Sequence, residues 1–249
     1  MTAEGRAGAA TPTTPQEPGP SAQTALLRQH PLFSRLDQAI LAELVQFAVV
    51  RRFGDGELVF RQGDPGNAIY GVLSGRVRIF APGPDGGEIT LNLLEPGELF
   101  GEIATLDGKP RTASAVAMET TALLQLRRDA LQAALRRHPG FAEGVILLLC
   151  ERLRWTSDLI EDAAFLPLPA RLAKRLLALA RLHGDAEGRI RLRLSQKELA
   201  TLVGASRESV NKLLAQWRDQ GFVELQRQRL LLLDPAGLAR VADGTAVAA

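Results

Sequence analysis

The spacing of apolar residues changes twice along the chain and divides it into three parts. From Leu26 to about Ala48, apolar residues recur every three or four positions, which predicts helix. From Val49 to about Leu126, short segments alternate apolar and polar residues between glycine-containing turns, which predicts a train of short strands in a barrel or sandwich. After Arg127 the spacing is helical again.

One long helix, predicted over residues 140–164, carries a distinctive row of side chains. The steps between its members alternate between three and four residues, which is the a/d spacing of helices that pair along their length. The row consists of Ile146, Leu149, Leu153, Thr156, Ile160 and Ala163. Such a row can pack on its own domain, but a two-fold pair of identical helices is its simplest use, so we expect a homodimer.

These patterns predict an α+β chain in several parts. Residues 1–24 are rich in Pro, Thr, Ala and Gly without any period, which is typical of a disordered tail. Residues 25–139 are expected to form the β domain and 140–164 the dimerisation helix. Pro167 and Pro169 then interrupt the helix, so a C-terminal domain is expected over 165–243, followed by a tail over 244–249.

Charge is unevenly distributed between these parts. Residues 1–164 hold 16 Lys and Arg against 20 Asp and Glu, whereas residues 165–249 hold 14 against 8. A basic C-terminal domain suggests a polyanionic partner, although solvated charged faces explain the same numbers. The single Cys150 excludes a disulfide framework within the chain. No secretory leader and no apolar run of membrane-spanning length are visible, so we expect a cytoplasmic protein without a membrane partner.

Residues 195–218, SQKELATLVGASRESVNKLLAQWR, have the pattern of a helix-turn-helix. Ser195 and Glu198 fit a capping box at the start of one helix, and Gly204 suits the turn that ends it. Ser206 is a candidate cap for the next helix. The second helix of such a pair can enter the major groove of double-stranded DNA.

The exposed start of that second helix carries side chains that can recognise base edges. Arg and Lys address guanine, Glu accepts from cytosine and Asn pairs with adenine. A hairpin that follows would place two arginines near phosphates, as a wing does. The candidate DNA-binding residues are Ser206, Arg207, Glu208, Asn211, Lys212, Arg227 and Arg229. The alternative is an ordinary helical hairpin with a charged, solvated face.

Within the β domain, residues 100–113, FGEIATLDGKPRTA, combine one acid, one arginine and a glycine. Gly101 would let the backbone approach a ligand, and the N–H groups after it can hold phosphate oxygens. Arg111 can bind a phosphate in a bidentate manner, while Glu102 can accept from a sugar hydroxyl. Together they suggest a sugar phosphate; the alternative is a Glu102–Arg111 salt bridge that closes a surface loop.

Residues 100–113 resemble the phosphate-binding cassette of cyclic nucleotide-binding domains, and VFRQGDPGNAIYGVLSGRVRI (59–79) resembles the β-roll signature of the same superfamily. With the helix-turn-helix behind them, the chain from about Leu26 to Asp243 is similar to the cyclic AMP receptor protein (Crp/Fnr) family of bacterial transcription regulators. The resemblance implies a β-roll (jelly roll) sensor, a long dimerisation helix and a winged helix-turn-helix. It also implies a palindromic DNA operator, RNA polymerase as a partner, and cAMP or cGMP as an allosteric ligand, with no cofactor.

The resemblance also assigns roles to residues. Glu102 is expected at the ribose 2′-hydroxyl and Arg111 at the cyclic phosphate, with backbone from Gly101 and Ile103 and a hydroxyl from Thr112. The Thr156–Ser157 pair is expected at the purine, from one subunit and its partner. A hydroxyl at Thr156 that merely bonds its own helix is the alternative.

Two positions depart from the cyclic AMP receptor protein. Thr112 stands where that protein has serine, which leaves the choice between cAMP and cGMP open. Lys212 replaces an arginine of the recognition helix, so a different operator is expected because lysine lacks the planar fork.

Other functions remain as alternatives. The same fold could regulate transcription constitutively or respond to another ligand, such as a cyclic dinucleotide. An enzyme is disfavoured because no nucleophile–base pair or Walker loop is visible. No metal site is expected, since His30, His138 and His183 are scattered and an iron–sulfur cluster lacks its cysteines.

Overall fold

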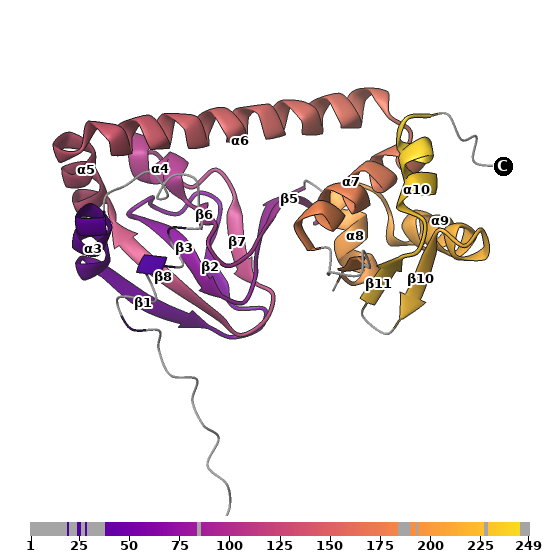
Figure 1. Cartoon of the computed structure of the whole chain (residues 1–249), viewed down its shortest axis with the longest axis horizontal. Coiled ribbons are helices and arrows are strands. Elements are labelled where there is room, and N and C mark those ends of the chain that lie inside the picture. The colour runs from indigo at the N-terminus through magenta and orange to yellow at the C-terminus, as the bar shows by residue number, and fades with distance from the viewer. Residues whose placement is uncertain are drawn as a thin grey trace, which may run out of the picture.

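The computed structural model describes residues 19, 24–25, 28, 38–83, 86–183, 190–192, 194–226 and 229–244, with the side chains of 181–183, 190–192 and 229 left aside. A β domain and a helical C-terminal domain lie side by side, and one long helix runs along both (Figure 1). The predicted tail over 1–24, apart from two positions, lies outside the described residues, as does nearly all of the tail over 244–249. So do residues 26–37 of the first predicted helix, apart from position 28.

Two four-stranded antiparallel sheets form the β domain. Strands pair across long stretches of sequence; β1, for example, pairs with β8 from Ala48 opposite Leu126 to Phe53 opposite Thr121. The first sheet has the order β1 (Ala48–Phe53), β8 (Thr121–Arg127), β3 (Ala68–Ser74) and β6 (Leu99–Phe100). The second has the order β2 (Leu58–Phe60), β7 (Ser114–Ala117), β4 (Val77–Pro82) and β5 (Glu88–Leu94).

Alternating side chains of the two sheets fill the interior of this sandwich. Tyr70 and Val72 of β3 meet Val77, Leu94 and Phe100 there. The outer face of the first sheet is covered by helices, which form a second cluster with its leucines. These helices are α3 (Gln38–Gln46), α5 (Arg128–Arg137) and the beginning of α6 (Pro139–Phe165), while the short α4 (Glu102–Asp107) follows β6.

The helix α6 connects the two domains. Proline at its first position suits the start of a helix, because a proline there loses no helical hydrogen bond. The chain leaves helical geometry at Leu166, before Pro167, and resumes in α7 (Leu168–His183). The predicted interruption of the long helix is therefore present.

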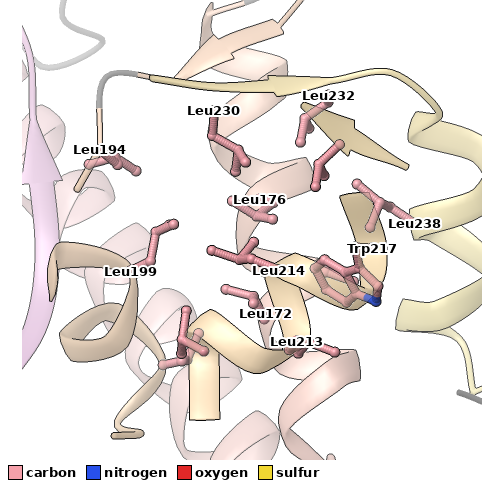
Figure 2. Close-up of a cluster of buried hydrophobic side chains, with 14 of the residues drawn as sticks. Leu172, Leu176, Leu194, Leu199, Leu213, Leu214, Trp217, Leu230, Leu232 and Leu238 are labelled. Atoms are coloured by element: carbon pink, nitrogen blue, oxygen red, sulfur yellow. The ribbon is translucent and has the colours of Figure 1, made fainter. Parts of the chain in front are cut away.

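The C-terminal domain encloses its own core. In Figure 2, Leu172 and Leu176 of α7 lie close to Leu214 and Trp217, and Leu230 of the hairpin lies above them. The capping box of Ser195 and Glu198 is present at the start of α8. The domain contains β9 (Ile190–Leu192), α8 (Gln196–Val203), α9 (Arg207–Asp219), β10 (Val223–Gln226), β11 (Arg229–Leu232) and α10 (Pro235–Ala242). A winged helix-turn-helix was predicted and is observed; β9, which pairs with β11, was not anticipated.

The two domains touch at β5. The helix α8 packs against this strand, and the hydroxyl oxygens of Thr90 and Thr201 lie 2.8 Å apart. Leu93 of the same strand packs against the core of the C-terminal domain. The strand therefore belongs to the β domain and also forms part of the domain interface.

Candidate functional site

A cavity of ≈ 200 Å³ lies in the β domain beside α4 and α6. Strand β6 leads directly into it, because its last residue, Phe100, precedes the turn at Gly101. Six of the seven residues predicted to bind a cyclic nucleotide line this cavity, namely Gly101, Glu102, Ile103, Arg111, Thr112 and Thr156. Ser157 does not line it in the single chain.

Gly101 links β6 to α4 in a conformation that few other residues adopt. Its φ angle of 80° lies in the left-handed region. A Cβ atom at this position would also come within 2.6 Å of Nη1 of Arg111. The glycine is therefore needed for the turn and for the position of the arginine.

Arg111 is a buried cation in the wall of the cavity, only 4% exposed. Its Nη1 donates to the carbonyl of Gly101 at 2.7 Å and its Nη2 to that of Ala68 at 2.6 Å. The guanidinium lies over the ring of Phe60, 4.2 Å from the centroid, and its Nε has no hydrogen-bond partner. Burial lowers the pKa of Arg111, while Tyr70, Glu102 and Asp64 oppose that shift.

Glu102 is also buried, at 6% exposure, but it faces another arginine. Nε of Arg152, from α6, lies 3.9 Å from its carboxylate, and Nη2 of Arg152 donates to the carbonyl of Leu99 at 2.7 Å. Among the described residues, no carboxylate is ion-paired with Arg111. The alternative of a Glu102–Arg111 salt bridge on the surface is therefore not what the structure contains.

The hydroxyls predicted near the ligand have mixed surroundings. Thr112 is exposed at the mouth of the cavity. Thr156 donates to the carbonyl of Arg152 at 2.8 Å, and Ser157 donates to that of Leu153 at 3.0 Å. Both hydroxyls thus donate to carbonyls of their own helix, which is the alternative stated above for Thr156. Each hydroxyl oxygen can still accept a hydrogen bond.

The predicted recognition helix corresponds to α9. The hydroxyl of Ser206 caps it by accepting from the backbone N–H of Ser209 at 3.1 Å. The side chains of Arg207, Glu208 and Lys212 are exposed, whereas that of Asn211 is half-buried. Arg227 lies outside the described residues, and only the backbone of Arg229, in β11, is described.

One face of α6 exposes large apolar side chains to solvent in the single chain. Ile146, Leu153 and Ile160 are 60%, 68% and 66% exposed. Thr156 and Ala163 of the predicted row are exposed too, while Leu149 packs partly against its own domain. A row of this length without a cover is typical of a surface that associates.

Comparison with known families decides what these parts belong to. Residues 50–138 match the cyclic nucleotide-binding domain family, and residues 170–241 match the Crp-like helix-turn-helix domain family. The chain belongs to the Crp/Fnr family of transcription regulators. It is thus a DNA-binding regulator with a cyclic nucleotide-binding domain and not an enzyme, as the sequence predicted.

Regulators of this family match most of the chain. The CRP-like cAMP-activated global transcriptional regulator of Mycobacterium tuberculosis is 36% identical over 86% of this chain and 97% of its own. The cyclic AMP receptor protein of Thermus thermophilus is 38% identical over 88% and 100%. The solved structure of the c-di-GMP responsive regulator CLP of Xanthomonas campestris matches 79% of this chain and 99% of its own, with 26% identity and a TM-score of 0.70.

Several residues around the cavity of this Crp/Fnr regulator were not predicted from the sequence. Phe60, whose ring lies against the guanidinium of Arg111, could not be identified from the sequence, because it is one apolar residue among others in a strand. Arg152 stands four positions before Thr156, on the same side of α6, and that spacing could have identified it. Trp155 also lines the cavity.

None of the described helices is long and apolar enough to cross a membrane.

Proposed function

We propose that this Crp/Fnr regulator is gated by a 3′,5′-cyclic nucleotide, cAMP or cGMP, that binds in the β-domain cavity. The observation that carries the proposal is Arg111. It is a buried cation with an unpartnered Nε and no ion-paired carboxylate among the described residues, and it lines a cavity next to a buried acid. A buried charge without a counterion is costly, so a bound phosphate would stabilise it.

Each predicted residue has a role in this proposal. Arg111 would bind the cyclic phosphate, with the backbone of Gly101 and Ile103 and the hydroxyl of Thr112 beside it. Glu102 would accept from the ribose 2′-hydroxyl. The relative from M. tuberculosis is named as cAMP-activated, and that from T. thermophilus as a cyclic AMP receptor, which supports a cyclic nucleotide as the ligand.

The purine would meet α6. We expect Thr156 of one protomer and Ser157 of its partner at the base, because the exposed row of α6 would bring a second copy of the helix there. Each dimer then carries two α9 helices, which must lie one duplex turn apart, about 34 Å, to read a palindromic operator. The nucleotide can shift the orientation of the two helices only by its differential affinity for the two states. RNA polymerase is the further partner that such a regulator would engage.

Two measurements on purified full-length protein test the proposal. Calorimetry with cAMP and with cGMP should show binding to the cavity. Selection from a random duplex library, with and without the bound nucleotide, should enrich a palindrome and show a change in operator affinity. Nucleotide binding without any change in operator affinity would contradict gating.

A cyclic dinucleotide is the second candidate ligand. A second hollow, of ≈ 430 Å³, lies at the domain interface and shares Asn92, Arg152 and Trp155 with the nucleotide cavity. Two adjoining hollows suit a ligand with two bases, and the similar structure from X. campestris is described as c-di-GMP responsive. Calorimetry with cyclic di-GMP separates this candidate from the first.

A further inference from the structure

Trp155 lies in the wall between two hollows. It lines the nucleotide cavity together with Glu102 and Arg111. It also lines the larger hollow at the domain interface, together with Arg175 of α7 and Leu202 of α8. A side chain that borders both spaces can contact a molecule in the first and also the α7 and α8 residues that line part of the second.

The orientation of the indole is fixed from two directions. Its Nε1 donates to the carbonyl of Leu91, in β5, at 3.2 Å. The guanidinium of Arg175 lies 4.6 Å from the centre of its ring, in a cation–π arrangement. Arg175 lines the interface hollow but not the nucleotide cavity, whereas Trp155 lines both.

Arg175 is firmly part of the C-terminal domain. It is 6% exposed and lies on α7 between Leu172 and Leu176, two fully buried members of that domain's core. Its Nη2 is 3.4 Å from the carboxylate of Asp162, which is 3% exposed. Burial lowers the pKa of Arg175, and Asp162 and Asp158 oppose that shift. A movement of its guanidinium would therefore affect the position of α7.

The strand to which Trp155 is hydrogen-bonded also contacts the C-terminal domain. Leu91 lies in β5 between Thr90, which bonds Thr201 of α8, and Leu93, which packs on the core of the C-terminal domain. The indole thus contacts α7 through Arg175 and, through its hydrogen bond to β5, the strand against which α8 packs.

We propose that Trp155 is the stacking platform for the base of the bound nucleotide, and that its contact with Arg175 couples the occupied cavity to the DNA-binding domain. This inference rests on the proposed function. Any base can stack on an aromatic ring, because every base has a π-face. The same ring attracts a cation to its face, so a base stacked on Trp155 would alter the interaction between the ring and Arg175. Coupling between two sites typically changes affinity by about 5- to 150-fold.

Intrinsic fluorescence tests the stacking. The chain has two tryptophans, and the other, Trp217, is fully buried in the C-terminal core. Titration with cAMP or cGMP should change the tryptophan emission of the wild type, and Trp155→Phe should lose that change while calorimetry still detects binding. Trp155→Leu should lower nucleotide affinity at least about tenfold, since a base gains much of its affinity from an aromatic platform. Unchanged emission on binding, or unchanged affinity in Trp155→Leu, would overturn the platform.

Arg175→Met tests the coupling, and Lys174→Met is its matched control. Lys174 is the neighbouring residue and forms an ion pair with the same Asp162, at 2.5 Å, whereas the cation–π contact described for the indole is with Arg175. The measured quantity is the ratio of operator affinities with saturating nucleotide and without it. Arg175→Met should bring this ratio at least about fivefold closer to one, while Lys174→Met keeps it within about twofold. Equal effects of the two variants would mean that the ion pair, not the ring contact, matters, and would overturn the inference.

Trp155→Leu provides a second route should Arg175→Met fail to fold. It leaves the Arg175–Asp162 pair intact. At saturating nucleotide it must therefore bring the ratio of operator affinities as close to one as is expected for Arg175→Met. The double variant should lose little more than either single variant. If wild-type protein binds neither nucleotide, the proposed function fails and this inference with it. If it binds but neither variant changes the ratio, this inference alone fails.

Discussion

The guanidinium of Arg111 occupies the space that a side chain on residue 101 would need. A Cβ on Gly101 would lie 2.6 Å from Nη1 of Arg111, and the same Nη1 donates to the Gly101 carbonyl at 2.7 Å. The turn and the arginine therefore depend on each other. The glycine lets the arginine lie against the backbone, and the arginine donates to the carbonyl of Gly101, directly after β6. A change at either residue should disturb the other.

Gly101→Ala should lower the affinity for nucleotide, beyond what a general loss of stability would cause. A residue with a side chain costs about 1–2 kcal/mol in the left-handed region, and here the added methyl would also displace Arg111. We expect an affinity loss of roughly tenfold or more, measured by calorimetry. Gly56→Ala is the control, because Gly56 has a φ of 75° and open space around its Cβ position. It should lose similar stability and no affinity; equal affinities in the two variants would contradict the role of Gly101.

Arg111→Leu should abolish nucleotide binding and reduce stability moderately. In this variant the carbonyl of Ala68 loses the Arg111 donor, while that of Gly101 still accepts from the hydroxyl of Thr105 at 2.7 Å. A buried carbonyl left unsatisfied costs about 1–3 kcal/mol. Calorimetry measures the binding, and thermal unfolding by circular dichroism shows that the fold is retained. Arg78→Leu removes a half-buried arginine of β4 that pairs with Glu88 outside the cavity, so it should leave affinity unchanged. Full affinity in Arg111→Leu would refute the phosphate role.

The parts of the fold that were predictable from sequence depend on local chemistry. Alternation marked the strands, because each has one face in a core. The capping box at Ser195 and the glycine at 204 marked the two ends of α8. Gly101, Glu102 and Arg111 were candidates because a glycine, an acid and an arginine so close together suggested a sugar phosphate.

The parts that were not predictable depend on contacts between distant segments. Strand β1 pairs with β8, and no local pattern encodes that choice. The six-residue α4 is too short for a helical period to show. Arg152 reaches Glu102 from a helix fifty positions away, and Trp155 meets Arg175 across the break between α6 and α7. The sequence therefore indicated candidate binding residues that line the cavity, but not the neighbouring residues that contact them or the second domain.

Leu153→Glu should convert the proposed dimer into a monomer. Burying a leucine contributes about 1.5–3 kcal/mol, and two-fold symmetry counts it twice, so the dissociation constant should rise roughly a hundredfold or more. Sedimentation velocity at micromolar concentration measures the state of association. Val49→Glu alters an apolar side chain of β1 that is 56% exposed, away from α6, and should leave the dimer intact. A dimer that survives Leu153→Glu would show that the row on α6 does not carry the association.

Arg207→Ala should reduce the choice between bases more than the total affinity for DNA. Arg207 is the first residue of α9, exposed and free of any described ion pair, so its guanidinium is available to the major groove. A bidentate contact with a base is worth roughly 1–3 kcal/mol, and its loss should relax the preference at one position of each half-site. Arg218 lies at the other end of α9, where it pairs with Asp219 at 2.7 Å. Arg218→Ala should therefore leave the sequence preference unchanged. Repeating the duplex selection with each variant gives the comparison, and an unaltered palindrome with Arg207→Ala would exclude Arg207 from base recognition.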